Sequence, residues 1–364
     1  MQIKDIITHI ENLAPLSFQE SYDNAGLIVG QTTDEVHSAL ICLDVTEAVI
    51  DEAIANNHQL IISHHPLIFS GIKKINGKNE VERCVIKAIR NQIAIYAAHT
   101  NFDAVHGGVN SMIASKIDLQ NTQILSPLKG KLQKLVTFIP QTHFHAVESA
   151  LFKAGAGNIG NYDSCAFTSL GEGSFRGNDK SNPFVGEKGT IHRESEVRLE
   201  SIFPSHLQHN IIQALKESHP YETVAFDLID LANELEIAGS GMIGELSEAI
   251  DEQTFLAMLK ETFQCGIIRH SALLGKKIKR VAICGGSGSF LIEASKMAKA
   301  DIFITGDMKY HDFFRAEKQL ILADIGHFES EQFTQHIFHE LLIKKIPNFA
   351  VHLTTQNTNA VNYF

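Results

Sequence analysis

The chain has 364 residues, of which 44% are apolar, enough for two domains with their own hydrophobic cores. A net charge of -11 and the absence of a long Lys/Arg run argue against nucleic acid as a partner, because phosphate binding needs a concentrated basic face. The five cysteines are scattered without a CxxC pair. With no signal peptide at the amino terminus and no apolar window of about 18 residues, we expect a cytoplasmic protein that does not enter a membrane.

Strands and helices alternate through the first third of the chain. Apolar residues at helical spacing or in short runs bounded by turn residues define these elements. The predicted order is a helix at 3–13, a short strand near 27–30, a strand at 39–43, a helix at 47–56, a strand at 59–63, a helix at 80–91, a strand at 93–98 and a helix at 107–117. Such βαβ units predict a mostly parallel sheet.

Two adjacent histidines end one of these buried strands. The run Leu60-Ile-Ile-Ser-His-His-Pro66 places His64 and His65 at the carboxyl edge of the sheet, where α/β proteins bind ligands. Neighbouring side chains of an extended chain point in opposite directions, so two metal ions suit this pair better than one. A structural role for the pair is the alternative.

The next strand also ends on polar residues, His99-Thr-Asn-Phe-Asp103. His99 and Asp103 should therefore lie at the same edge of the sheet as His64 and His65. His99 is either a further metal ligand or a group that holds Asp103 or a water molecule by a hydrogen bond, and we favour the second role.

A different pattern begins after residue 128. Residues 129–233 predict two β-α-β halves, with helices at 144–153 and 205–218, which is typical of a ferredoxin-like α+β module. The βα alternation resumes at 234–364, with helices at 253–262, 290–298 and 331–345 and strands at 279–284, 301–305 and 319–323. We therefore predict a discontinuous α/β domain, 1–128 and 234–364, interrupted by a smaller domain at 129–233.

The last of these strands leads into His327 and Glu331. Their spacing of four brings both side chains to one face of a helix. With His64, His65 and Asp103, three strand ends now supply three imidazoles and two carboxylates. Five ligands of this mix are too many for one tetrahedral ion and suit two divalent ions bridged by a carboxylate.

The order of motifs resembles the NGG-interacting-factor family of dinuclear metal proteins, whose members include GTP cyclohydrolase 1 type 2 homologues. The motifs are Tyr22-Asp-Asn-Ala-Gly-Leu27, Ser63-His-His-Pro-Leu67, His99-Thr-Asn-Phe-Asp103, Thr305-Gly-Asp-Met-Lys-Tyr-His311 and Gly326-His-Phe-Glu-Ser-Glu331. The inserted domain similarly resembles the PII/CutA-type domain of longer members, with His219-Pro-Tyr-Glu222 as its signature. The closing segment Asn357-Thr-Asn-Ala-Val361 departs from the Pro-Phe ending of many members.

This resemblance implies two divalent ions per chain, Zn, Fe or Mn, bound by His64, His65, Asp103, His327 and Glu331. It also implies a ring-shaped hexamer and a metal-activated hydroxide that attacks C8 of the guanine ring of GTP. His99, Asp307 and His311 are the expected catalytic residues, which would move protons or contact substrate, although Asp307 and His311 are equally suited to orienting the ligands.

Several alternatives stay open. A phosphoesterase or another nucleotide hydrolase needs the same five ligands, and a non-enzymatic metal-binding or regulatory hexamer is the alternative from another class. Gly285-Gly-Ser-Gly288 is either a phosphate loop or a tight turn. Glu329 is either a general base or a solvated or capping carboxylate, and Asp23 and Asn24 either reach the site or brace their loop.

Overall fold

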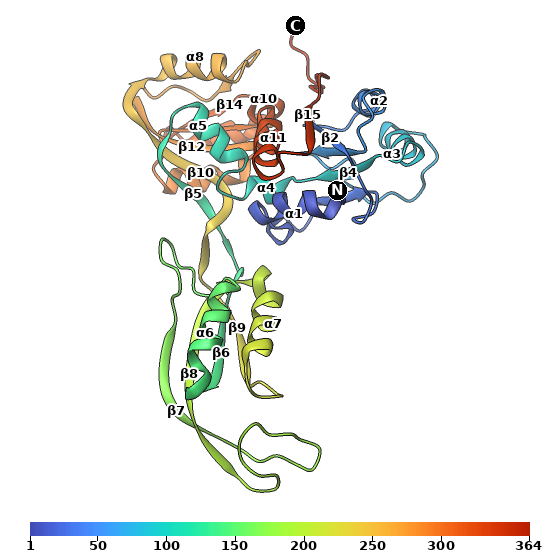
Figure 1. Cartoon of the computed structure of the whole chain (residues 1–364). Coiled ribbons are helices and arrows are strands. Elements are labelled where there is room, and N and C mark those ends of the chain that lie inside the picture. The colour runs from blue at the N-terminus through green and yellow to red at the C-terminus, as the bar shows by residue number, and fades with distance from the viewer. The chain divides into compact units, whose positions relative to one another are not determined.

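The computed structural model describes residues 1–364 and divides the chain into two compact units. The first contains Met1–Ser126 and Ala238–Phe364, and the second contains Pro127–Ile237. We had expected the insert at 129–233. The fold class is the predicted one, α/β interrupted by α+β, with more sheets than the sequence indicated (Figure 1).

One sheet of the first unit is built from the amino-terminal half and closed by the last strand of the chain. Its order is β1 (Gly26–Val29), β4 (Ala94–Ala97), β3 (Leu60–Ser63), β2 (Ser38–Cys42) and β15 (Ala350–Leu353). All neighbours are parallel except β1 and β4. The helices of this part are α1 (Ile3–Leu13), α2 (Glu47–Ala55), α3 (Glu80–Arg90), α4 (Thr100–Asp103) and α5 (Val109–Lys116), with a 3-10 turn, η1, at Leu16–Phe18.

Sequence patterns explain the central strands of this sheet. Every residue of β3 and β4 is buried, as expected for parallel strands covered on both faces. Thr46 caps α2 by accepting a hydrogen bond from the Val49 amide. The strand β15 was not predicted, because it is short and only its parallel pairing with β2 defines it.

A second sheet in the same unit contains the later strands. Its order is β11 (Arg269–His270), β14 (Ile321–Asp324), β13 (Ile302–Gly306), β12 (Lys277–Ser287), β10 (Glu234–Asp251) and β5 (Gln120–Lys129). The strands β12, β13 and β14 are parallel, β10 is antiparallel to β12, and β11 is antiparallel to β14. The helices are α8 (Glu252–Thr262), α9 (Ile292–Met297), α10 (His327–Glu331) and α11 (Thr334–Lys345), with 3-10 segments η4 (Ser289–Leu291) and η5 (Tyr310–Ala316).

Two details here correct the sequence analysis. The strands β5 and β10 were not predicted; the chain leaves the first unit within β5 and returns to it within β10. The single helix expected at 331–345 is two helices, α10 and α11. This break matters for function, because α10 carries both His327 and Glu331.

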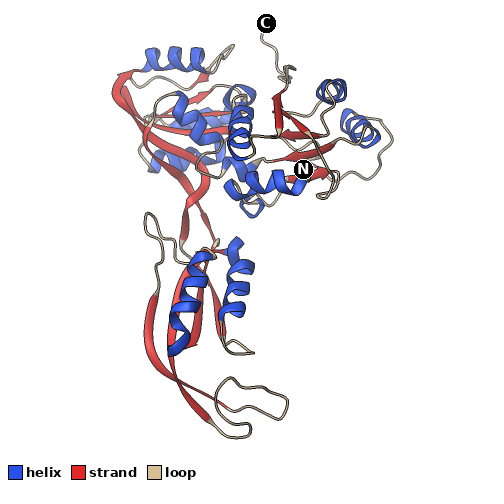
Figure 2. Ribbon diagram, in the orientation of Figure 1, coloured by secondary structure: helices blue, strands red, loops and turns tan.

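The second unit is a four-stranded antiparallel sheet with two helices (Figure 2). The strands follow the order β7 (Phe167–Phe175), β8 (His192–Pro204), β6 (Leu132–Pro140) and β9 (Phe226–Leu231). The helices α6 (Phe144–Lys153) and α7 (Gln208–Ser218) follow the 3-10 turns η2 (Gln141–His143) and η3 (Ser205–Leu207). Leu151 and Leu215 of these helices pack with Leu135 and Phe203 of the sheet in one buried core.

No helix of the structure is both long and apolar enough to span a bilayer. All five cysteines are free thiols.

Candidate metal centre

The five expected ligands come together at one place, although they come from two different sheets. His64 and His65 follow β3, and Asp103 ends the short helix α4 that follows β4. His327 and Glu331 open and close α10, which follows β14 of the other sheet. The sequence correctly placed all of them after strands, but the expectation that a single sheet supplies them is wrong.

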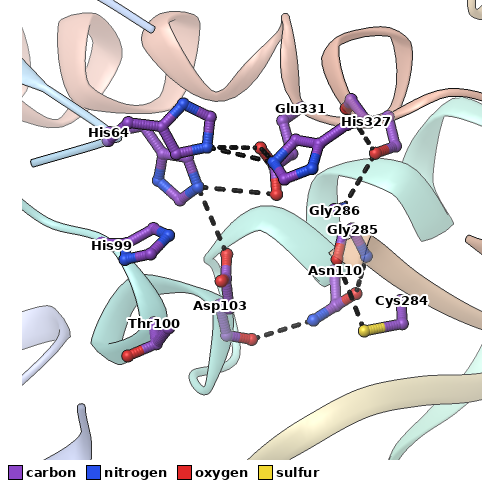
Figure 3. A network of polar contacts seen from close by, with 12 residues as sticks. His64, His99, Thr100, Asp103, Asn110, Cys284, Gly285, Gly286, His327 and Glu331 are labelled. Carbon is purple, nitrogen blue, oxygen red and sulfur yellow. Dashed lines mark hydrogen bonds and ion pairs between the residues drawn. The ribbon is translucent and has the colours of Figure 1, made fainter. Parts of the chain in front are cut away.

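Glu331 lies at the centre of this group (Figure 3). Its Oε2 is 3.0 Å from His65 Nε2 and 3.1 Å from His327 Nε2. Its Oε1 is 3.7 Å from His64 Nε2, and that nitrogen is 3.6 Å from Asp103 Oδ1. Glu331 therefore has one oxygen facing each half of the group.

The geometry divides the ligands into two clusters that share Glu331. One cluster is His65, His327 and Glu331, the other is His64, Asp103 and Glu331, and within each the ligand atoms lie within 4.8 Å of one another. Two buried atoms of the group, His64 Nε2 and Asp103 Oδ1, have no hydrogen-bond partner. Unsatisfied buried donors and acceptors are costly. This donor set of imidazoles and carboxylates fits divalent cations.

Each histidine of the group is held through Nδ1, the ring nitrogen that does not face the other ligands. The Nδ1 atom of His64 lies 2.9 Å from the Ala98 carbonyl oxygen. His65 Nδ1 is 2.7 Å from Asp44 Oδ1, and His327 Nδ1 is 2.6 Å from Asp307 Oδ2. These acceptors favour a proton on Nδ1 and leave the Nε2 lone pair free for an ion, which is the usual arrangement behind a metal-binding histidine.

The charges of the site shift several pKa values. Burial raises the pKa of Asp103, and the negative charge of Glu331 adds to this, to about 8. Burial lowers the pKa of His65 and His327, but hydrogen bonds to Asp44, Asp307 and Glu331 outweigh it and raise the values to about 10 and about 11. Burial opposes ionisation of Glu331 too, yet the surrounding histidines hold its pKa well below its usual range. Cation binding here must displace protons.

Glycines let Glu331 reach its position. A Cβ atom on Gly286, where φ is +59°, would lie 2.4 Å from Glu331 Oε1, and one on Gly306 would lie 2.8 Å from the His327 amide nitrogen. The Gly285 amide donates to Asn110 Oδ1 and the Gly286 amide to Ser330 Oγ. Because these amides are already engaged, the phosphate-loop hypothesis for this turn is not supported, and close packing against Glu331 explains the glycines.

His99 lies beside the ligands. Its ring centroid is 5.3 Å from that of His64 and 5.4 Å from that of His65, and its ligand atom joins theirs in a third possible cluster. Its Nδ1 is 2.8 Å from Asp23 Oδ1. Asp23 also accepts hydrogen bonds from the amide and hydroxyl of Thr100, so it both braces its loop and fixes the His99 ring.

The other two expected catalytic residues differ in position. Asp307 contacts His327 through its carboxylate and so orients a ligand. His311 is exposed, and its ring contacts the rings of Tyr310 and Phe314. The structure therefore brings Asp307 to the metal group and shows no such contact for His311.

Sequence reasoning missed three supporting residues. Asp44, which follows β2, holds His65, and Thr358 of the closing segment donates a hydrogen bond to the other Asp44 oxygen at 2.8 Å. Asn110 joins α5 to β12, because its amide group donates to the Asp103 carbonyl oxygen and accepts from Gly285 (Figure 3). Asp44 was detectable, because it too comes directly after a strand of the same sheet.

Glu329 is not the solvated carboxylate that was one of its predicted roles. Its side chain is buried, and its carboxylate accepts a hydrogen bond from the Tyr363 hydroxyl. The close approach of its carboxylate to Gly326, where a Cβ would lie 2.1 Å away, shows that it packs beneath the start of α10.

Comparison with known proteins gives consistent matches. The family model described as Duf34/NIF3 (NGG1p interacting factor 3) matches residues 1–360. A GTP cyclohydrolase 1 type 2 homolog from Halalkalibacterium halodurans is 38% identical over 307 residues, or 84% of this chain and 82% of that protein. The protein of the same name from Bacillus subtilis is 35% identical over 340 residues, or 93% of this chain and 91% of that protein.

A solved structure supports the same relationship. The crystal structure of a Bacillus cereus protein related to NIF3 superposes with a TM-score of 0.86 and 38% identity, covering 100% of this chain and 99% of that one. The fold, the order of motifs and these matches together show that this chain belongs to the Duf34/NIF3 (NGG1p interacting factor 3) family.

Proposed function

We propose that this chain is a dinuclear-metal-dependent hydrolase that binds two divalent ions, Zn, Fe or Mn. His65, His327 and Glu331 hold one ion, and His64, Asp103 and Glu331 hold the other. The observation that carries the proposal is the position of Glu331, whose two oxygens each face a separate cluster while buried ligand atoms lack partners. A carboxylate that bridges two ions is typical of dinuclear hydrolytic sites.

The residues around the ligands would orient the histidines and move a proton during hydrolysis. When bound, two such ions supply Lewis acidity that makes water a nucleophile near neutral pH. Asp44 and Asp307 keep their histidines in the orientation that binds an ion. His99 is the residue best placed to move a proton, because Asp23 fixes one ring nitrogen and the ring lies beside His64 and His65.

The proposed substrate is a nucleotide, with GTP as the first candidate. The support is the name of the relatives, GTP cyclohydrolase 1 type 2 homolog. The ligand group itself requires only a bond that water can attack, so other nucleotides belong in the test.

The test is elemental analysis together with turnover. Protein loaded separately with Zn, Mn or Fe should contain close to two ions per chain and hydrolyse a member of a nucleotide panel. His64→Ala should lower the ion content, whereas His145→Ala, a change at a side chain that is 93% exposed in the second unit, should not. An ion content that His64→Ala leaves intact would refute the ligand assignment, and a metal-loaded protein without turnover of any nucleotide would refute the hydrolase.

A regulatory role without catalysis is the second candidate. Its support is a cavity of about 610 Å³ formed wholly by the second unit and lined by aromatic side chains that include Phe138, Phe175 and Tyr221. Ion binding without turnover of any nucleotide would support this candidate; if turnover is found, its retention after deletion of this unit would make the unit regulatory.

Assembly as a hexamer is part of the proposal. Exposed apolar side chains on β7, such as Phe167 and Leu170 at 69% and 72% exposure, support self-association. Light scattering after gel filtration measures the assembly, and a monomer would contradict it.

A further inference from the structure

Two exposed aromatic rings lie near His99 and have no part in holding the metal ligands. Phe69 is 51% exposed and Tyr22 is 63% exposed. The centroids of these two rings are 6.3 Å apart. On its other side Phe69 contacts His99, and the centroids of those two rings are 6.2 Å apart. Single exposed aromatics are common on protein surfaces, but a chain of rings that ends on the proposed proton carrier is a specific arrangement.

The residues next to these rings fix where the rings stand. Asp23, adjacent to Tyr22, accepts hydrogen bonds from His99 and from Thr100. The Asn24 side chain donates to the carbonyl oxygen of Ile68, the neighbour of Phe69, at 2.6 Å. The two loops are thus tied to each other and to the segment that bears His99, which holds in place the backbone that carries both rings.

Tyr22 also lies within electrostatic range of a metal ligand. Burial raises the pKa of its phenol, and the charges of Glu20, Asp23 and Asp103 raise it further.

We propose that Tyr22 and Phe69 form an aromatic wall that seats a flat heteroaromatic ring, such as a purine or pyrimidine base, beside His99. The reason is chemical: exposed aromatic faces bind bases by stacking, which tolerates any base because each has a π face. A sugar phosphate without a base offers no such face. This inference rests on the proposed function for the identity of the site, and it names the part of the substrate that the site recognises.

The chain has no tryptophan, which provides a direct probe. In Phe69→Trp the only indole stands in the wall, and a stacked base quenches its fluorescence. Zinc-loaded Phe69→Trp protein is titrated with guanosine, adenosine and cytidine monophosphates and with ribose 5-phosphate. We expect saturable quenching by at least one of the nucleotides and none by ribose 5-phosphate.

A matched control places the indole elsewhere. Ile89 is 57% exposed on α3 and lies with Ala94 and Gln59 at the amino ends of β3 and β4, the opposite edge of the sheet from His64. The emission of Ile89→Trp should not respond to the nucleotides.

Tyr22 is tested in the Phe69→Trp background. Tyr22→Leu removes the ring and should raise the Kd of the quenching nucleotide about tenfold, as expected for the loss of one stacking partner. Tyr22→Phe keeps the ring and should retain the affinity, which separates stacking from any role of the hydroxyl group.

The outcomes separate this inference from the proposed function. Quenching by no nucleotide, equal quenching by ribose 5-phosphate, or an unchanged Kd in Tyr22→Leu would overturn the aromatic wall even if the metal-loaded protein shows turnover. Base-dependent quenching in a protein without turnover would uphold the wall and count against the hydrolase.

Discussion

Glu331 and His65 come from different sheets, yet Glu331 Oε2 lies 3.0 Å from His65 Nε2. The same carboxylate faces His64 through its other oxygen at 3.7 Å. One side chain on α10 therefore faces both clusters that could each hold a metal ion.

Replacing Glu331 should affect both ions. We expect Glu331→Gln, which keeps the shape but removes the charge, to lower the content from two ions per chain to one or none, because a neutral amide cannot bridge two cations. Inductively coupled plasma mass spectrometry measures this. Glu340→Gln, a change at an exposed carboxylate on α11, is the control. Two tightly held ions in Glu331→Gln would show that it does not bridge them.

Gly286→Ala should disturb the centre by pushing on Glu331, since the added Cβ would lie 2.4 Å from Oε1. We expect weaker ion binding and a loss of about 1–3 kcal/mol in the free energy of unfolding, from the positive φ and the clash together. Gly275→Ala is the matched control, because its φ is +68° but nothing lies within 4 Å of the added atom. Urea unfolding of both variants separates the cost of the positive φ from the cost of the clash. Equal losses of unfolding free energy in the two variants would show that the clash with Glu331 contributes nothing.

Asp44→Asn should weaken ion binding about 10- to 100-fold, because Asp44 fixes the His65 ring and strengthens it as a ligand. Thr358→Ala removes only the hydrogen bond to the second Asp44 oxygen, so we expect a smaller effect in the same direction. Competition with a chromogenic chelator measures both affinities. If Thr358→Ala weakens ion binding more than Asp44→Asn does, Thr358 does not act through Asp44.

His99 and His311 should behave differently. His99→Ala should lower kcat about 100-fold or more while the ion content stays the same, as expected for loss of a proton carrier. His311→Ala should change neither, because His311 is exposed and contacts Tyr310 and Phe314 instead of the ligands. Loss of an ion in His99→Ala would instead make His99 a ligand.

Asp23 should make stability fall in acid. Burial raises the pKa of Asp23, but hydrogen bonds from His99 and Thr100 outweigh it and lower the value from 3.8 to about 2. Because the folded pKa lies below the unfolded one, the contribution is fully present above pH 4 and is lost as the pH falls toward 2. The Asp23 side chain is fully buried, so the contribution is about 2 kcal/mol.

Asp23→Asn tests this contribution. The variant should be less stable at neutral pH, and its unfolding free energy should change less between pH 4 and pH 2. Urea unfolding across this range measures the difference. A variant whose acid profile parallels that of the natural chain would contradict the assignment.

Local patterns were sufficient for the central strands that precede His64, His65 and Asp103, because buried apolar runs predicted β3 and β4. They did not predict the short helices α4 and α10. The polar residues that follow these strands were correctly placed at the carboxyl edge, because parallel strands present that edge together. The strands β5, β10 and β15 were missed, since their pairing partners are distant in sequence and their own patterns are weak.

The sequence alone predicted that His64, His65, Asp103, His327 and Glu331 lie together, because each follows a strand in a recognisable motif. Only the folded chain shows how these five side chains divide between two clusters. That division depends on two sheets meeting, on glycines that leave room for Glu331, and on Asp44, Asp307 and Ala98, which orient the histidines. These are contacts between residues far apart along the chain, and local sequence patterns do not encode such distances.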